Sequence, residues 1–450
     1  MFIPQTDSER EEMLRTIGVE SLEDLFKAVP EKYRFPKLDL LPSASEMEVM
    51  GELQEYAGAN ETAQDMTCFL GAGAYYHYIP AAVDSILRRG EFLTAYTPYQ
   101  AEISQGTLQA IFEYQSLIVN LTGMDVSNAS HYDGATAVAE AGILAYHQFR
   151  GKKPKIVVSP ALHPDYRATL RTYLCGFKDI NILGDEEGLD PFCTPEDLLK
   201  LVDDITCLVV VQYPDFFGRL ADFTRLAEAV HAAGALLAVA VNPTALGLFK
   251  APGEFGADIV VGEGQPLGIP LSFGGPYLGF FATKKEYAHK IAGRLVGETV
   301  DTQGRRGYVL TLTAREQHIR RERASSNICS NQGLMTLAAG IYLSLLGKSG
   351  LRKVAELCYQ KAHYAAKRLD LIPGYKVVTP EPFFHEFVVK CPRPVEEINA
   401  HLLEHGILGG FDLSREYKGL KNHMLIAVTE MIHREEIDHL CETLQEVSHD

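Results

Sequence analysis

The feature that most constrains this chain is an alternation of short apolar runs with helical segments, which begins near residue 115. The apolar runs are short, rich in β-branched residues, and lie at 155–159, 180–183, 207–212, 235–241, 259–261 and 277–282. Segments with helical patterning lie between them, at 168–175, 195–202 and 223–233. Parallel strands need crossover connections, which are usually helices. The order therefore predicts an α/β fold with a mainly parallel sheet and helices on both faces.

The two ends of the chain differ from this central pattern. Residues 1–60 predict an N-terminal helical arm, because 13–17 and 22–29 show helical periodicity before Pro30, Pro36 and Pro42. Such an arm either packs on a partner subunit or adds helices to its own domain. We assign 61–325 to a large domain. We assign 326–450 to a smaller C-terminal α/β domain, whose expected elements lie at 332–346, 375–378, 384–389, 395–403, 424–428 and 434–447.

Charge and cysteine usage narrow the class of protein. The formal net charge of −17 argues against nucleic acid as a partner, since phosphate binding needs an excess of Lys and Arg. The acidic, polar start at 1–15 does not resemble a signal peptide, and no apolar stretch reaches the length of a membrane helix. The eight cysteines are scattered without a C-x-x-C pair, so we expect reduced thiols, no metal site and a cytoplasmic location.

A loop of small residues precedes one predicted helix. The sequence SNASHYDGATA spans 127–137 and leads into a run of Ala, Val, Glu and Leu. Free backbone N–H groups at such a helix start can bind an anion such as a phosphate. The alternative interpretation is an ordinary helix start capped by Asp133 or Thr136. Near the end of a strand, His163 is interpreted as a satisfied loop histidine.

The order of a large domain with alternating strands and helices, followed by a smaller α/β domain, resembles the fold-type I enzymes that use pyridoxal phosphate (PLP). The resemblance implies that the helix after the small-residue loop holds the cofactor phosphate. It also implies an Asp at a later strand end, which pairs with the pyridine nitrogen. A Lys shortly afterwards forms the Schiff base.

Neither of these two cofactor residues is present where the resemblance places them. Val241 or Asn242 stands where the strand-end Asp is expected, and neither carries a negative charge. Glu263 and Gln265 occupy the stretch where the Lys is expected, and no Lys occurs between Lys250 and Lys284. The sequence therefore predicts that this chain has no Schiff-base lysine and does not bind PLP by itself.

Three further motifs identify a narrower family. They are FLGAGAYYHYIP at 69–80, YTPYQAEISQG at 96–106, and AREQHIRRERASSNIC at 314–329. Together they resemble glycine dehydrogenase (decarboxylating), the P-protein of the glycine cleavage system, and the resemblance covers roughly residues 5–445. In the two-subunit forms of this family, the subunit of this length lacks the lysine and the second subunit carries it.

This resemblance implies an enzyme that is active only as a complex, expected to be a heterotetramer. The second subunit would bear PLP, glycine would be the substrate, and the lipoyl arm of the H-protein would accept the aminomethyl group. The residues of this chain that would contribute at a shared active site are Tyr96, Tyr99, Gln100, Ser104, Gln105, His318 and Arg320. The aromatic residues among them are equally compatible with packing, and the run 315–323 with a solvated helix face.

Two other functions stay open. One is an independent PLP enzyme related to aminotransferases or desulfurases, with Lys250 or Lys284 as the anchor. The other is a purely structural or regulatory subunit with no residue in the active site.

Overall fold

The computed structural model describes residues 4–177, 179–185, 190–328 and 330–449. Cys329 lies outside the described residues, and it is the last residue of the motif at 314–329. Residues 1–3 and 450 at the two termini also lie outside them. The chain divides into two compact units, Met1–Glu61 and Thr62–Asp450. Each unit is considered by itself.

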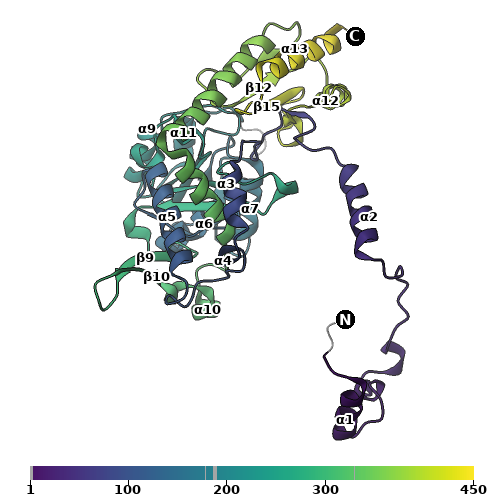
Figure 1. The fold of residues 1–450 in the computed structure, drawn as a ribbon. Coiled ribbons are helices and arrows are strands. Elements are labelled where there is room, and N and C mark those ends of the chain that lie inside the picture. The colour runs from purple at the N-terminus through teal and green to yellow at the C-terminus, as the bar shows by residue number, and fades with distance from the viewer. Residues whose placement is uncertain (1–3, 178, 186–189, 329, 450) are drawn as a thin grey trace. The chain divides into compact units, whose positions relative to one another are not determined.

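The first unit consists of two helices and two single 3₁₀ turns (Figure 1). The helices are α1 (Asp7–Ile17) and α2 (Glu46–Gly58), and the turns are η1 (Glu23–Phe26) and η2 (Glu31–Tyr33). Thr6 and Ser45 form capping boxes with Glu9 and Glu48, which explains where both helices begin. The stretch 22–29 forms only the turn η1 and no longer helix.

The core of the second unit is a seven-stranded sheet in the order β2-β8-β7-β6-β5-β3-β4. Five neighbouring strands are parallel, namely β3 (Lys155–Val158), β4 (Asn181–Leu183), β5 (Thr206–Tyr213), β6 (Leu236–Val241) and β7 (Ile259–Glu263). The last two, β8 (Gly279–Thr283) and β2 (Val126–Ser127), continue the sheet in antiparallel pairs. The predicted mainly parallel sheet is confirmed.

Side chains alternate along these strands between two hydrophobic cores, as the pleat of a strand requires. Val209, Val211 and Val239 face one core together with α5 (Gln105–Thr122), α9 (Thr224–Ala232) and the first part of α11 (Gly333–Leu369). On the other face, Leu208 and Val210 pack with α6 (Gly134–Gln148) and α7 (Pro164–Leu174). Both faces are covered by helices, so the strands carry continuous apolar runs.

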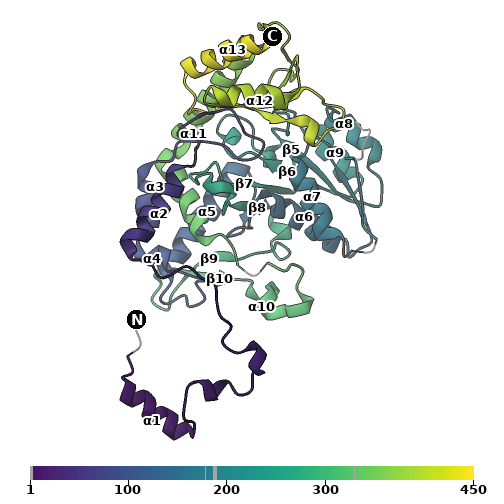
Figure 2. The same ribbon diagram turned by 90° about the vertical axis from the view of Figure 1, so that its right-hand side faces the viewer.

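The C-terminal part of this unit has its own sheet and core. The strands β11 (Lys376–Val377), β12 (Glu386–Lys390), β15 (His423–Ala427) and β14 (Phe411–Asp412) are all antiparallel. Helices α12 (Val395–Glu404) and α13 (Arg434–His449) pack on this sheet. Figure 2 shows them at one end of the unit, with the hairpin β9 (Leu295–Val300) and β10 (Arg306–Thr311) at the other.

The helix α11 and the strand β1 are among the connections between the C-terminal part and the rest. The long helix α11 has a break at Gly347 (φ 57°). Its first half packs in the core of the seven-stranded sheet, and its last part, 362–369, packs in the C-terminal core. By length and composition α11 alone among the described helices could cross a bilayer, but many of its side chains lie in these cores. The early strand β1 (Thr67–Cys68) pairs in parallel with β13 (Ile407–Leu408), and Phe69 is buried in the C-terminal core.

Candidate functional site

Helix α6 begins at the small-residue loop with a complete cap. The Asp133 carboxylate accepts a hydrogen bond from the backbone N–H of Thr136 at 2.7 Å. In return, the Thr136 hydroxyl oxygen accepts from the backbone N–H of Asp133 at 3.1 Å. Asp133 is therefore the helix cap, as one of the two interpretations of the loop predicts.

The carboxylate of Glu263, at the end of β7, reaches the same helix start. One oxygen accepts from the backbone N–H of Gly134 at 3.0 Å. The other accepts from the N–H groups of Gln265 at 2.9 Å and Leu278 at 3.0 Å. Burial raises the pKa of Glu263 to about 7, and the three N–H donors oppose this rise. Glu263 is thus a buried carboxyl group held by backbone donors.

Gln265 occupies the stretch where the resemblance expects a lysine, and it holds a neighbouring loop. Its side-chain oxygen accepts from the backbone N–H of Tyr75 at 2.8 Å, and its amide donates to Tyr75 O at 2.9 Å. The same amide donates to Ile269 O at 2.9 Å. The hydroxyl of Tyr75 donates to Glu386 at 2.7 Å, so the loop also connects to the C-terminal sheet.

The two flanking lysines lie elsewhere. Lys284 pairs with Asp258, which immediately precedes β7 and so lies at the opposite end of this strand from Glu263. Five strand residues at about 3.3 Å each separate the two ends by roughly 16 Å. Lys250 is exposed, with its ammonium 4.6 Å from the ring centre of Phe255. Neither lysine is among the residues that line the cleft beside Glu263.

The end of β6 carries no charge of the kind a pyridinium needs. Val241 is buried in the core. The side-chain oxygen of Asn242 accepts from the backbone N–H of Thr244 at 3.0 Å, and its nitrogen lies 3.1 Å from Nε2 of His385. Burial holds the pKa of His385 well below its usual range, so that ring is neutral.

The cleft at this edge of the sheet is small. Its cavity measures about 30 Å³ and is lined by Gly73, Tyr75, His163, Tyr166, Asn242 and Glu263, among others. The ring of His163 stacks on Tyr166 with centroids 4.8 Å apart, and its Nε2 donates to Ala72 O at 2.7 Å. Gly73 has φ +112°, and a Cβ there would lie 2.7 Å from His163 Nε2. A space of this size holds a water molecule or two, so these residues do not fit PLP.

A second region brings together two of the residues singled out in the motifs. The rings of Tyr99 and His318 meet edge to face, with centroids 5.5 Å apart. The guanidinium of Arg294 donates to the Tyr99 hydroxyl at 3.4 Å and lies 5.8 Å from the ring centre. Glu316 lies 4.0 Å from Arg294 and 3.6 Å from His318. Neither Arg294 nor Glu316 was named as a site residue from the sequence: Arg294 lies in no motif, and Glu316 lies within the motif at 314–329.

Two cavities flank Arg294. The larger, about 410 Å³, has several basic lining residues, including Arg294, Arg315, Arg320 and Arg323. The smaller, about 240 Å³, is lined by Tyr96. Both cavities share Arg294, Ser330 and Asn331. Tyr96 and Arg320 therefore lie in adjoining cavities rather than in one.

The remaining motif residues have other environments. Gln105 ties α5 to β10, since its side chain donates to Tyr308 O at 2.8 Å and accepts from Tyr308 N at 2.9 Å. Ser104 precedes α5 without a side-chain cap, and Gln100 is exposed. Gln105 thus joins two elements of the fold.

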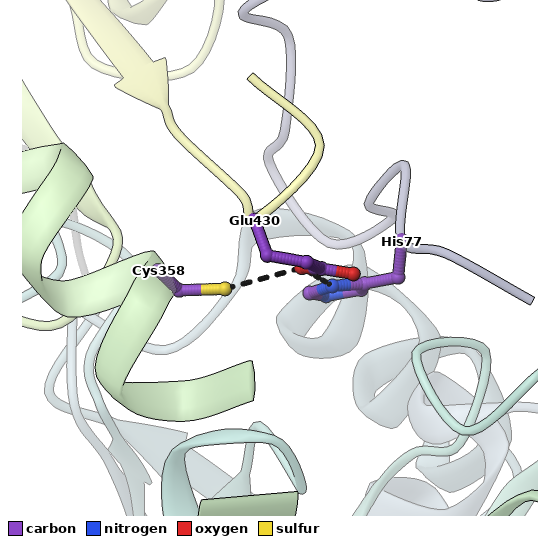
Figure 3. A group of neighbouring side chains, drawn as sticks. All are labelled: His77, Cys358 and Glu430. Atoms are coloured by element: carbon purple, nitrogen blue, oxygen red, sulfur yellow. Dashed lines mark hydrogen bonds and ion pairs between the residues drawn. The ribbon is translucent and has the colours of Figure 1, made fainter. Parts of the chain in front are cut away.

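A buried polar cluster lies between α11 and the C-terminal sheet (Figure 3). Nδ1 of His77 lies 2.7 Å from Glu430, and the thiol of Cys358 donates to the same carboxylate at 3.3 Å. Their ligand atoms lie close enough to hold a metal ion, as do those of His401, His405 and Glu446 at the surface. Cysteine spacing alone could not reveal the first group, because its three residues are far apart in sequence. The Glu430 carboxylate is already engaged by His77 and by the backbone N–H of Tyr78 at 2.8 Å.

Comparison with known proteins decides the family. The family described as "Glycine cleavage system P-protein" matches residues 1–444. The chain belongs to the P-protein family. A relative from Thermomicrobium roseum, named "Probable glycine dehydrogenase (decarboxylating) subunit 1", is 55% identical over 100% of both chains. The protein of the same name from Desulforamulus reducens is 53% identical and covers 99% of this chain and 100% of its own.

Solved structures show the same fold. The chain is similar to glycine decarboxylase (P-protein) of the glycine cleavage system in inhibitor-bound form. Their TM-score is 0.90 and their identity 45%, over 99% of this chain and 100% of the other. A glutamate decarboxylase from Lactobacillus brevis shares the fold at a TM-score of 0.70 and 15% identity, over 95% and 97% of the two chains. The expected fold-type I architecture is confirmed.

Proposed function

We propose that this chain is the subunit of glycine dehydrogenase (decarboxylating) that does not bear the cofactor. With a PLP-bearing partner subunit, in a heterotetramer, it decarboxylates glycine and passes the aminomethyl group to the lipoyl arm of the H-protein. The observation that carries the proposal is the small cleft lined by Glu263, whose carboxylate takes the place of a phosphate at the helix start, while Gln265 occupies the stretch where a lysine would be needed. Relatives of the same length are named as subunit 1.

The contribution of this chain lies on its surface beside Arg294. Tyr96 and Tyr99 both belong to the motif at 96–106, and both are exposed, Tyr96 to 81% and Tyr99 to 54%. Large exposed aromatic side chains of this kind are typical of interfaces. We place Tyr96, Tyr99, His318 and Arg320 at the boundary with the partner's active site, where they bind or orient substrate. The seven described cysteines are all free, which favours the reducing cytoplasm as its location.

Reconstitution tests this function. The isolated chain should show no aldimine absorbance and no release of CO2 from glycine, and activity should appear when the partner subunit is added. Borohydride treatment of the isolated chain with PLP should not produce one lysine that is labelled stoichiometrically with the pyridoxyl group. A stoichiometric pyridoxyl-lysine on this chain, with turnover in the absence of the partner, would show an independent PLP enzyme instead.

One observation favours a purely structural or regulatory subunit as a second candidate. Gln105, within the motif at 96–106, joins α5 to β10. If the whole motif is structural, alanine substitutions across residues 96–104 will leave the kinetics of the assembled complex unchanged. If it borders the active site, at least one of them will lower kcat or raise KM for glycine.

A further inference from the structure

The start of helix α6 offers backbone N–H groups at the positive end of the helix dipole, where anions bind. In this chain the Glu263 carboxyl group, which is ionised above its pKa of about 7, occupies this position. Glu263 is 8% exposed, and its oxygens accept one backbone N–H at the start of α6, from Gly134 at 3.0 Å, and two outside the helix, from Gln265 at 2.9 Å and Leu278 at 3.0 Å. No Lys or Arg of the described chain is among its hydrogen-bond or ion-pair partners. The donors are thus main-chain groups, which cannot turn away when the carboxylate is removed.

Backbone packing leaves no room for a second anion beside this carboxylate. A Cβ on Gly134 would lie 2.3 Å from the Tyr166 hydroxyl and 2.9 Å from the backbone nitrogen of Glu263. The end of β7 therefore presses directly against the helix start. Glu263 fills the space between them, and the adjoining cavity of about 30 Å³ is too small for a phosphate ester.

We propose that the Glu263 carboxylate is a built-in substitute for a bound anion, which satisfies the start of α6 and keeps the cleft of this chain closed without any cofactor. Removal of the side chain then converts the position into a binding site for a small monoanionic carboxylate. The proposal concerns this chain alone, and it holds whether or not the partner and substrate are those proposed above.

Chemical rescue tests the proposal on the full-length chain. Glu263→Ala should lower Tm by at least about 5 °C, since buried donors lose their acceptor. Sodium formate should restore several degrees in a saturable manner, relative to sodium chloride at equal ionic strength. Glu254→Ala, at an exposed position, is the matched control and should respond to formate as the wild type does. An equal formate response in all three proteins would overturn the proposal.

A second measurement covers the case in which Glu263→Ala does not fold. Calorimetric titration of the wild-type chain with pyridoxine 5′-phosphate, which has no aldehyde, should detect no one-to-one complex at this cleft. Amide hydrogen exchange at Gly134 should be unchanged by the ligand. Stoichiometric binding that protects Gly134 would show that the cleft opens to a phosphate and would contradict the proposal. Neither readout depends on glycine turnover, so failure here is distinct from failure of the proposed function.

Discussion

The side-chain amide of Gln265 hydrogen-bonds both backbone groups of Tyr75, accepting from its N–H at 2.8 Å and donating to its carbonyl at 2.9 Å. The two residues are 190 positions apart. The contact holds the loop at 69–80 against the end of β7, so that Tyr75 lines the cleft there. Gln265, in the stretch where the resemblance led us to expect a lysine, is thus a buried residue that holds a distant loop.

We expect Gln265→Ala to destabilise the chain by about 3 kcal/mol, because three buried hydrogen bonds are lost at roughly 1 kcal/mol each. Urea denaturation of the isolated chain measures this change. The control is Gln109→Ala on the exposed face of α5, which should change the unfolding free energy by less than about 0.5 kcal/mol. A cost for Gln265→Ala as small as that of the control would show that the loop is held by other contacts.

Asp133→Ala should lower the unfolding free energy by about 1 kcal/mol, since the backbone N–H of Thr136 loses its acceptor at the start of α6. Asp133→Asn keeps an acceptor oxygen and should cost only a few tenths of that amount. Paired denaturation curves measure both changes. Equal losses in the two variants would mean that the negative charge matters more than the hydrogen bond.

Much of the fold could be predicted from the sequence because its signals are local. Buried parallel strands produce runs such as 207–212, and β5 (Thr206–Tyr213) forms where that run predicts it. The absence of a lysine and of a strand-end Asp is likewise visible residue by residue. The structure places Glu263 and Asn242 in the lining of one small cleft, as their common strand-end positions indicate, and Gln265 holds Tyr75 of the same lining.

The contacts that close the cleft could not be predicted, because they join segments that are distant in sequence. Glu263 lies 129 positions from Gly134, and no spacing rule connects them. Arg294 follows no motif, yet it contacts Tyr99 from 195 positions away. The early strand β1 gives no local sign that it pairs with β13 in the C-terminal part. Such pairings depend on the assembled tertiary structure.

The lowered pKa of Glu430 leads us to expect that the stability of the fold depends on pH. Burial alone would raise the pKa of this carboxyl, but the charge and hydrogen bond of His77 and the N–H of Tyr78 lower it from 4.5 to about 2. A carboxyl group with a lowered folded pKa stabilises the fold above pH 4.5, and this stabilisation is lost as pH falls toward 2. Such a shift corresponds to about 3 kcal/mol.

Glu430→Gln should therefore be less stable than the wild type by up to about 3 kcal/mol at pH 6, and the difference should shrink at pH 3. Denaturant titrations of both proteins at the two pH values measure it. Glu435→Gln, at an exposed position on α13, is the matched control and should show no such trend. A difference that stays constant with pH would mean that the carboxylate is not stabilised by His77.

The exposed apolar side chains of the N-terminal unit lead us to expect that it takes part in assembly with the partner subunit. None of its described residues is buried, while Phe35, Leu38, Leu41, Met47 and Tyr56 are among its exposed apolar side chains. A surface of this kind is typical of a segment that docks on another chain. Deletion of residues 1–61 should leave the Tm of the isolated chain within about 2 °C of the full-length value. Analytical ultracentrifugation with the partner subunit should show weaker association. Unchanged association would place the arm outside the interface.

Tyr99 offers the sharpest test of the surface beside Arg294. Its hydroxyl accepts from Arg294 at 3.4 Å, while the ring is more than half exposed at 54%. Tyr99→Phe should change Tm of the isolated chain by less than about 2 °C, because this long, exposed hydrogen bond contributes little to stability. If the hydroxyl and Arg294 together orient substrate in the assembled complex, kcat/KM for glycine should fall at least about tenfold, a loss of about 1.4 kcal/mol. Tyr78→Phe, at another exposed tyrosine, is the control and should keep full activity. Parallel losses of Tm and activity in Tyr99→Phe would assign the residue to packing, because a packing residue lowers activity only by loosening the fold.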